Sequence, residues 1–279
     1  MILIADSGST KTDWCYGSDI HQYKLIQTEG INPVHQSEET IRKIITNGLI
    51  PQLPVSGRCT AIYFYGAGCL PTKTTGMIHL LEEYFPYANV YVESDLLGAA
   101  RALCKNQPGI ACILGTGSNS CLFDGKRITH NISPLGYILG DEGSGAYLGK
   151  RFIGDCLKGQ LPEVLKDGLL EELKMTPSDI IDRVYRQPQA NKFLASITPY
   201  IYNHKDMKPV HDFLTDCFKE FFRRNVLLYP KRLPVSFVGS IAWNFKEEIM
   251  EVAHDYNLQM GLFIKSPIDE LARYHYLND

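Results

Sequence analysis

The sequence predicts an α/β protein of two domains, each built on a mixed β-sheet flanked by helices. Two stretches, residues 1–16 and 110–123, each place an apolar run before a small, hydroxylated, glycine-bearing turn and continue into a second apolar run. That pattern is typical of strand, tight turn, strand. After each of these hairpins, strand-like and helix-like segments alternate, which favours a mixed sheet covered on both faces. With 279 residues, the chain is long enough for two cores.

The first half contains the elements of one such domain. After the opening hairpin, the pattern predicts a third strand at residues 22–27 and a loop at 29–33 containing Ile-Asn-Pro. Further strands are predicted at 61–65 and 90–92, and helices at 37–49, 72–85 and 96–105. A turn at Gln107-Pro108-Gly109 marks the boundary, so the first domain is predicted at 1–107 and the second at 108–266.

The second half repeats this plan with an insertion. A strand meander is predicted at 110–131, and GDEGSG at 140–145 opens a helix that reaches about residue 157. Residues 160–230 have a helical pattern almost throughout, with breaks at prolines, and are interpreted as a helical insertion. Strands at 235–238 and 262–264 and a helix at 242–256 follow. A closing helix at 267–279 is expected to pack back on the first domain.

Composition excludes several classes of protein. The formal net charge of −3 and the lack of any basic run argue against a nucleic-acid or membrane-surface binder. No charged leader and no apolar run of membrane-spanning length is present, so a cytoplasmic protein is expected. The eight cysteines include no CxxC pair and are interpreted as reduced, buried residues, and the histidines lack zinc-ligand spacing.

The first turn suits a polyphosphate. Gly8 permits close approach of the backbone, Lys11 supplies a mobile positive charge, and Asp6 at the end of the strand can hold a hydrated magnesium ion. Hydroxyls are offered by Ser7, Ser9, Thr10 and Thr12. An ordinary hairpin turn is the alternative, because Gly and Ser are common turn residues. The second hairpin, with GTGSN at 115–119, favours the phosphate interpretation, since two such turns indicate a duplicated fold that holds one nucleotide. Neither turn is a P-loop or a dinucleotide-binding fingerprint.

Taken together, these motifs resemble the N-acetylglucosamine kinase and BadF/BadG-type ATPase family, within the superfamily of sugar kinases, heat-shock chaperones and actin. The resemblance rests on DSGSTKT at 6–12, Ser94-Asp95, LGTGSN at 114–119, GDEGSG at 140–145 and VGSI at 238–241. It covers most of the chain in motif order, except the helical region. It implies two actin-like (ribonuclease H-like) domains with a cleft between them, ATP lying across the cleft and a sugar at its base.

The resemblance also implies roles for individual residues. Asp6 would serve Mg²⁺. The nucleotide-binding residues would be Ser9, Thr10, Lys11, Gly115, Thr116, Gly117, Gly239 and Ser240. The sugar-binding residues would be Asn32, Asp95, Asn119, Leu135, Gly136 and Asp141. Amino-sugar kinases of the family often have Trp-Gly where this chain has Leu135-Gly136, so the aromatic wall of the pocket is replaced here.

Asp95 is the candidate catalytic residue. It follows a short strand and precedes a helix, which places it at the carboxyl edge of the sheet where open α/β folds bind ligands. A carboxylate there can accept the proton of an attacking sugar hydroxyl. Helix capping by Ser94 or Asp95 is the plain alternative. Likewise, Asp141 and Glu142 can complement a helix dipole, and Asn32 before a proline can be a turn residue.

Two classes of function follow. The first is an ATP-dependent kinase that phosphorylates the 6-hydroxyl of N-acetylglucosamine, with N-acetylmuramic acid as the alternative substrate. The second is an ATPase coupled to a protein partner, like activators of the same superfamily, which hold an iron–sulfur cluster with cysteines. No cysteine pair here has suitable local spacing, which favours the kinase. The expected partner is a small amino sugar, and a homodimer is an expected assembly.

Overall fold

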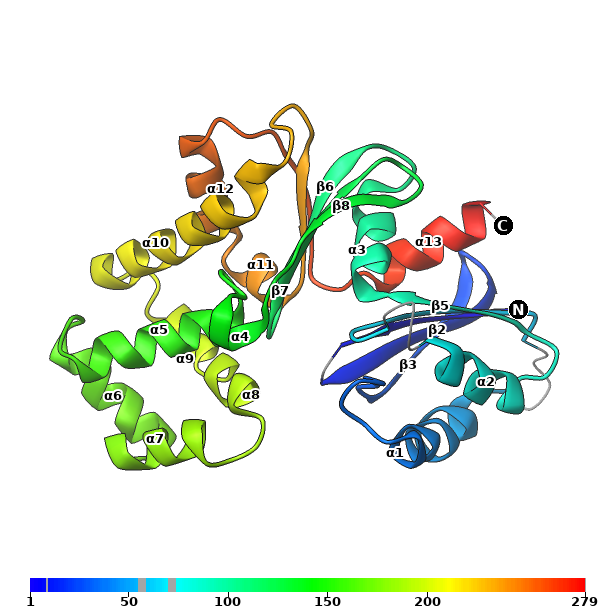
Figure 1. Ribbon diagram of the computed structural model, residues 1–279, viewed down its shortest axis with the longest axis horizontal. Helices are drawn as coiled ribbons and strands as arrows, with labels where there is room; N and C mark the ends of the chain where they lie inside the picture. Colours follow the sequence, from blue (N-terminus) through cyan, green and yellow to red (C-terminus); the bar gives the residue numbers. More distant parts are fainter. Residues whose placement is uncertain (9, 55–58, 70–73, 279) are drawn as a thin grey trace. The chain divides into compact units, whose positions relative to one another are not determined.

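The computed structural model describes residues 1–8, 10–54, 59–69 and 74–278, and the chain divides into two compact units. The N-terminal unit comprises Met1–Gln107, Asp124–Ile128 and Ser266–Asp279. The C-terminal unit comprises Pro108–Phe123 and Thr129–Lys265. Each unit contains a five-stranded mixed sheet with helices packed on it (Figure 1). The predicted α/β fold class is therefore confirmed.

The sheet of the N-terminal unit has the order β3-β2-β1-β4-β5. Its strands are β1 (Ile2–Ser7), β2 (Lys11–Asp19), β3 (Gln22–Glu29), β4 (Ala61–Gly66) and β5 (Asn89–Ser94). β2 runs antiparallel to β1 and β3, whereas β4 runs parallel to both β1 and β5. The carboxyl ends of β1, β4 and β5 therefore meet at one edge, where Ser7 pairs with Gly66 and Gly66 pairs with Ser94.

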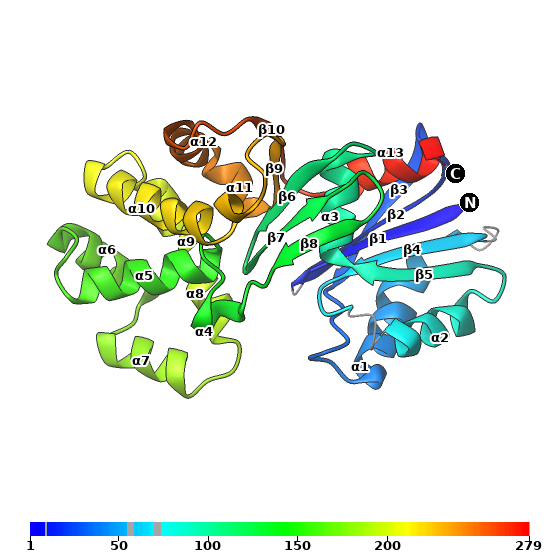
Figure 2. The ribbon, with the colours of Figure 1, turned by 45° about the horizontal axis from the view of Figure 1, so that its top comes forward.

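Helices cover both faces of this sheet, as Figures 1 and 2 show. One face carries α1 (Glu38–Lys43), the π-helical segment η1 (Ile44–Leu49) and α2 (Thr74–Tyr84), and the other carries α3 (Asp95–Cys104) and α13 (Ile268–Asn278). Leu3 and Ala5 pack in the core under α1 and α2, while Ile4 between them faces the other side, as a period of two requires. The helix predicted at 37–49 thus changes to π geometry partway, and residues 72 and 73 of another predicted helix lie outside the described residues.

The sheet of the C-terminal unit repeats the plan. Its order, β8-β7-β6-β9-β10, corresponds strand for strand to β3-β2-β1-β4-β5. The strands are β6 (Gly109–Leu114), β7 (Ser118–Phe123), β8 (Ile128–Ile132), β9 (Val235–Val238) and β10 (Met260–Ile264). β6 pairs antiparallel with β7 and parallel with β9, and Ile113 lies beside Val238. The turns after β6 and β9 therefore leave the sheet at the same edge.

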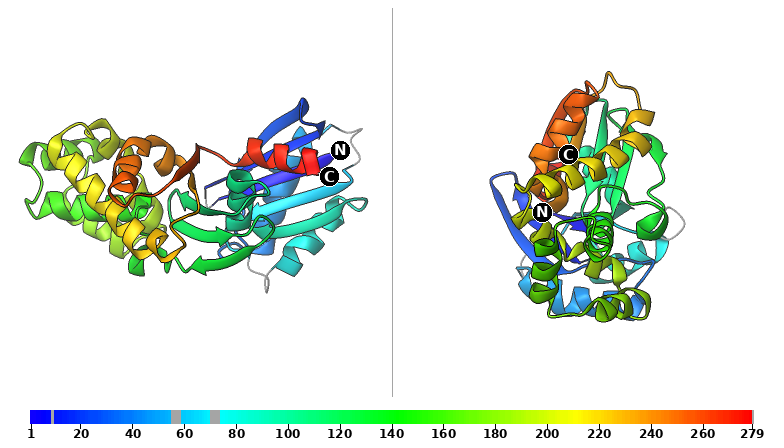
Figure 3. Two further views of the ribbon diagram at one scale, coloured as in Figure 1. Left: turned by 90° about the horizontal axis from the view of Figure 1, so that it is seen from above. Right: turned by 90° about the vertical axis from the view of Figure 1, so that its left-hand side faces the viewer.

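Nine helices of this unit surround its sheet or form the insertion, visible in Figure 3. They are α4 (Gly136–Leu139), α5 (Gly145–Leu157), α6 (Glu163–Leu173), α7 (Pro177–Tyr185), α8 (Ala190–Ala195), α9 (Thr198–Asn203), α10 (Lys208–Arg224), α11 (Ser240–Asn244) and α12 (Lys246–Asp255). Three of the prolines expected to break the insertion lie in the first turns of α7, α9 and α10, where their missing N–H costs nothing. The short helix α4 was not predicted.

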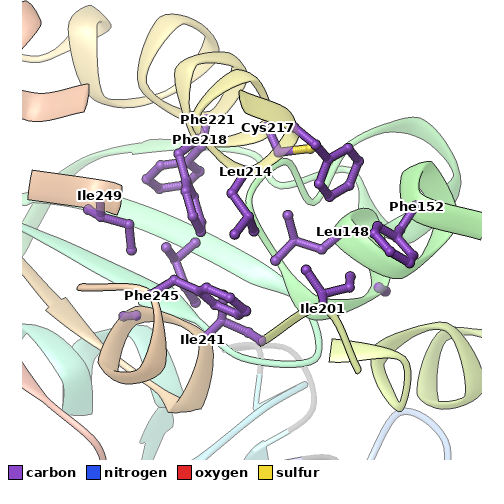
Figure 4. Packing of buried hydrophobic residues seen from close by; sticks show 14 of the residues in the cluster. Leu148, Phe152, Ile201, Leu214, Cys217, Phe218, Phe221, Ile241, Phe245 and Ile249 are labelled. Carbon is purple, nitrogen blue, oxygen red and sulfur yellow. The ribbon is translucent and has the colours of Figure 1, made fainter. Parts of the chain in front are cut away.

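The core of the C-terminal unit joins the insertion to the sheet. Phe218 and Phe221 of α10 pack with Leu148 of α5 and with Phe245, all fully buried (Figure 4). This packing fixes α5 relative to the strands. Within the part of the chain that the structure describes, no helix is both long and apolar enough to cross a membrane.

Close packing of α5 on α8 makes Gly149 a test of this arrangement. A Cβ at Gly149 would meet the carbonyl of Leu194, with its carbon at 2.7 Å, whereas a Cβ at Gly154 on the same helix would meet nothing within 4 Å. Gly149→Ala is expected to lower the free energy of unfolding by about 2–3 kcal/mol through overpacking. Gly154→Ala should raise it by up to ~1 kcal/mol through helix propensity. Chemical denaturation measures both, and equal effects would contradict the close contact.

Candidate active site

The N-terminal unit gathers acidic and polar residues at the carboxyl edge of its sheet. Asp6 lies near the end of β1, and Asp95 follows Ser94, the last residue of β5. Ser94 is the N-cap of α3, because its side chain accepts a hydrogen bond from the Leu97 backbone N–H. The carboxylate of Asp95 instead accepts from the Leu96 N–H at 2.8 Å. Ser94 therefore fills the capping role, and Asp95 is the first residue of the helix rather than its cap.

The carboxyl groups of Asp6 and Asp95 both have raised pKa values. Burial and, to a smaller extent, the negative charges of Asp95 and Asp13 raise the pKa of Asp6 to about 7, although the charge of Lys11 lowers it. Burial also raises the pKa of Asp95, against the effect of its backbone hydrogen bonds. The charge of Asp95 contributes to the raised pKa of Asp6, and the nearby cation Lys11 compensates only in part. The pair therefore fits a hydrated magnesium ion, which takes one or two carboxylates and keeps several waters.

The first turn holds its hydroxyls in two different ways. Ser7 and Thr12 are fully buried, their hydroxyls lie 2.6 Å apart, and the backbone N–H of Ile31 donates to the Ser7 hydroxyl at 3.0 Å. These two hydroxyls, which the sequence offered to a phosphate, instead fasten the turn to the loop that carries Asn32. Thr10 is exposed, and Ser9 lies outside the described residues. The expectation for Ser7 and Thr12 as phosphate contacts is thus corrected.

The side chains of Lys11 and Asn32 both make polar contacts within the N-terminal unit. The ammonium of Lys11 lies 2.6 Å from Asp13 and is more than half exposed. A bound phosphate would compete for a charge that is already paired, and a surface pair of this kind is weak. The side-chain oxygen of Asn32 accepts from the Val34 N–H at 3.0 Å, forming the expected turn, and its atoms lie against Gly68. Within residues 1–8, 10–54, 59–69 and 74–278, the side-chain nitrogen of Asn32 has no hydrogen-bond acceptor, so it can serve as a donor.

In the C-terminal unit, the predicted site residues lie around the second turn. The N–H groups of Gly145 and Ala146, at the start of α5, donate to the carbonyls of Gly115 and Thr116 at 2.8 and 3.1 Å. The helix start is thereby tied to the turn. Gly239 follows β9 with φ of +120°, and a side chain there would collide with the backbone of Leu114. The predicted phosphate turn and the predicted adenosine turn, Gly239-Ser240, therefore lie against each other.

Asp141 lies beside the second turn. It is 9% exposed, has φ of +53° and donates its N–H to the carbonyl of Pro134 at 2.8 Å. Its carboxylate approaches Gly117 so closely that a Cβ there would lie 3.0 Å from Oδ2. Burial raises the pKa of Asp141 to about 6, although the backbone N–H of Ser118 donates to the carboxylate and lowers it. Gly117 thus leaves room for the Asp141 carboxylate, and nucleotide binding by Gly117 stays a prediction.

Neighbouring charges hold the region of Asp141. Glu142 is 8% exposed and lies 3.5 Å from the guanidinium of Arg224 on α10. Lys150 of α5 donates to the carbonyl of Tyr137 on α4 at 2.8 Å. Neither cation was identified from the sequence: Arg224 reaches Glu142 from α10, far along the chain, and Lys150 reaches Tyr137 from the second turn of α5. Glu142, read from the sequence as a helix-dipole charge, is ion-paired instead.

The other sugar-binding candidates of this unit are close in sequence but differ in exposure. Asn119 lies on β7, half-buried, and its side-chain oxygen accepts from the Ser120 N–H. Leu135 is 62% exposed with φ of +61°, and Gly136 begins α4 with φ of +75°. In the described part of the chain, no cluster of three His, Cys, Asp or Glu residues is arranged to hold a metal by protein ligands alone.

Comparison with known proteins decides the family. No protein-family model matches the chain. The structure superposes with a TM-score of 0.95 on a protein from Porphyromonas gingivalis that was proposed as an N-acetylglucosamine kinase, at 48% sequence identity, covering 100% of this chain and 99% of that one. The chain belongs to the N-acetylglucosamine kinase and BadF/BadG-type ATPase family. The resemblance stated from the motifs is thereby confirmed, and so is the predicted enzyme class, an ATP-dependent sugar kinase, at the level of the family.

Two more distant proteins are also similar to this chain. An N-acetylmuramic acid/N-acetylglucosamine kinase from Clostridium acetobutylicum is 26% identical over 209 residues, which are 71% of this chain and 68% of that protein. A ROK-family glucokinase from Streptomyces griseus, solved with glucose and AMPPNP, has a TM-score of 0.57 at 12% identity, covering 99% and 98% of the two chains. The glucokinase shares the fold alone.

Proposed function

We propose that the protein transfers the γ-phosphate of ATP to the 6-hydroxyl of N-acetylglucosamine. The observation that carries the proposal is the placement of Asp95 at the carboxyl edge of a parallel strand beside Asp6, with the helix cap assigned to Ser94. A carboxylate freed from capping can act as a base, and a neighbouring carboxylate can serve a metal. Those are the two groups that phosphoryl transfer to an alcohol requires.

Each residue has a defined part in this proposal. Asp95 accepts the proton of the attacking hydroxyl, and Asp6 helps to hold Mg²⁺, which when bound neutralises phosphate charge. The exposed hydroxyl of Thr10 and the turn at Thr116 contact phosphates, and Lys11 exchanges Asp13 for a phosphate oxygen. Gly239 and Ser240 lie beneath adenosine.

The sugar is held by groups of complementary hydrogen-bonding character. The Asp141 carboxylate accepts from sugar hydroxyls, while the side-chain amides of Asn32 and Asn119 donate. Leu135 and Gly136 line the sugar where other members often have tryptophan and glycine. Both lie in the segment that Asp141 ties down through the Pro134 carbonyl.

N-acetylmuramic acid is the second candidate substrate, and Lys150 favours it. The lactyl carboxylate of that sugar needs a cationic partner, and residues 134–138 contain none. Lys150 reaches the carbonyl of Tyr137 within this segment. Burial lowers the pKa of Lys150, and the negative charges of Glu142 and Asp141 oppose this effect. Because Asp141 is one of the predicted sugar-binding residues, the Lys150 ammonium lies near the predicted sugar site. The Clostridium relative is described as acting on both sugars.

ADP release measured with four sugars tests the proposal. N-acetylglucosamine is expected to give the highest kcat/KM, followed by N-acetylmuramic acid, with glucosamine and glucose lower because they lack the acetamido group. Preference for N-acetylmuramic acid by more than about tenfold, worth ~1.4 kcal/mol, would make it the substrate instead. ATP hydrolysis that no sugar changes would favour an ATPase coupled to a protein partner. No turnover of any kind would remove the kinase assignment.

A further inference from the structure

Two asparagine side chains on neighbouring strands of the C-terminal unit are linked. The side-chain nitrogen of Asn131, on β8, donates to the side-chain oxygen of Asn119, on β7, at 2.9 Å. The same nitrogen donates to the backbone carbonyls of Ser120 at 2.7 Å and Ile132 at 3.2 Å. The N–H of Ser120 donates to the Asn119 oxygen at 2.9 Å. Asn119 is a predicted sugar contact, whereas Asn131 was not singled out by its sequence.

Backbone partners fix the orientation of both amides. A backbone N–H can only donate, so the atom of Asn119 that faces Ser120 must be its oxygen. Backbone carbonyls can only accept, so the atom of Asn131 that faces Ser120 and Ile132 must be its nitrogen. Turning either amide over would oppose two donors or two acceptors. The Asn119 side chain therefore presents its NH₂ group outward, and within the described residues this group has no acceptor.

The strands are held together independently of Asn131. Tyr229 is 4% exposed, and its hydroxyl donates to the Ser120 carbonyl at 3.0 Å and accepts from the Ile132 N–H at 2.9 Å. This hydroxyl already ties β7 to β8 on the buried side. A purely structural role for Asn131 would duplicate Tyr229. Asn131 contacts β7 at two points, the Ser120 carbonyl, which Tyr229 also binds, and the Asn119 side chain, which Tyr229 does not contact.

Asn119, whose NH₂ group donates hydrogen bonds, is next in sequence to residues that contact the Asp141 carboxylate, which accepts them. The Asp141 carboxylate accepts from the N–H of Ser118, the residue before Asn119, and it packs against Gly117. An ionised carboxylate only accepts hydrogen bonds, and the outward NH₂ of Asn119 only donates. The two side chains together match a neutral sugar that presents an acceptor oxygen beside a hydroxyl donor.

We propose that Asn131 is a positioning residue, which fixes the Asn119 amide as a hydrogen-bond donor to an acceptor oxygen of the sugar. The inference rests on the proposed function, because it concerns recognition of that substrate. Asn131 acts only through Asn119. Without it, the Asn119 side chain keeps a single bond, to Ser120, and samples rotamers in which its donor points away from the sugar.

A double-mutant cycle on the full chain tests this, with N-acetylglucosamine affinity measured by calorimetry. Asn119→Ala should weaken binding by about tenfold, the loss of one good hydrogen bond, and Asn131→Ala by about threefold. The double variant should bind no more weakly than Asn119→Ala alone, because a residue that acts through Asn119 has nothing left to position. Fully additive losses would overturn the inference.

Tyr229→Phe is the control for a structural role. It removes the hydroxyl that joins the strands and leaves the Asn119–Asn131 contact. It should lower the melting temperature and leave sugar affinity within about twofold. Asn131→Ala should instead weaken sugar binding and leave the melting temperature nearly unchanged. Equal loss of sugar affinity in both variants would show that Asn131 merely supports the strands. If the unmodified protein binds none of the four sugars, the proposed function itself fails. If the unmodified protein binds N-acetylglucosamine and Asn131→Ala binds it equally well, only the inference about Asn131 fails.

Discussion

Asp95→Asn is expected to lower kcat by about a thousandfold or more, with ATP affinity unchanged. The amide cannot accept the proton of the attacking hydroxyl, and it aligns that hydroxyl less well. An amide oxygen can still accept from the Leu96 N–H, so the start of α3 should keep its geometry. ADP release gives kcat, and calorimetry with magnesium ATP gives the affinity.

Ser94→Ala is the matched control for this variant. Ser94 caps α3, so its loss should cost about 1 kcal/mol of stability and leave kcat near normal. Asp95→Asn should show a large loss of kcat without a loss of stability, because burial raises the pKa of Asp95 and an uncharged amide avoids the cost of a buried charge. Near-normal turnover by Asp95→Asn would mean that Asp95 is only the first residue of a helix, and the proposed base would have to be sought elsewhere.

Asp141→Asn is expected to make the sugar-free protein more stable above pH 6. Burial raises the pKa of Asp141 from 3.8 to about 6 in the folded protein. Between these values the folded state binds more protons than the unfolded state, so stability falls as pH rises, and the full cost is present above pH 6. That cost is on the order of 3 kcal/mol, and an uncharged amide avoids it.

The same variant should bind N-acetylglucosamine about 10- to 100-fold more weakly, because a charged acceptor is replaced by a neutral one. Melting temperatures at pH 4.5 and pH 8 test the stability, and calorimetry tests the affinity. Glu142→Gln is the control: Glu142 is paired with Arg224, so this variant should gain no stability at pH 8. A stability gain for Asp141→Asn that is equal at both pH values would contradict burial as the cause, and unchanged affinity would remove Asp141 from the sugar site.

Much of the fold was predictable because its signals are local. Two apolar runs define β1 and β2, and a small turn joins them, so the hairpin needs no distant contact to be recognised. The duplicated plan followed from a second hairpin of the same kind, and both sheets have the predicted mixed character. The prolines interpreted as breaks in the helical region were also visible, and three of them lie in the first turns of α7, α9 and α10, where proline is suited.

Other features depended on partners far away in the chain. The change to π geometry in η1 and the short helix α4 have no pattern of their own. The burial of Ser7 depends on Ile31, and the pairing of Glu142 depends on Arg224. A hydroxyl or a carboxylate looks the same in a sequence whether it faces a ligand or a neighbouring backbone.

The sequence by itself determined the α/β class, the duplicated hairpins, the family and a set of candidate residues, because these depend on local periodicity and on motifs whose order is kept along the chain. Only the tertiary structure decided what each polar group faces. It assigned the cap to Ser94 rather than Asp95, turned Ser7 and Thr12 inward, and joined Asn131 to Asn119. The physical reason is that a hydrogen bond is directional and short, so the role of a side chain depends on atoms that folding brings within about 3 Å.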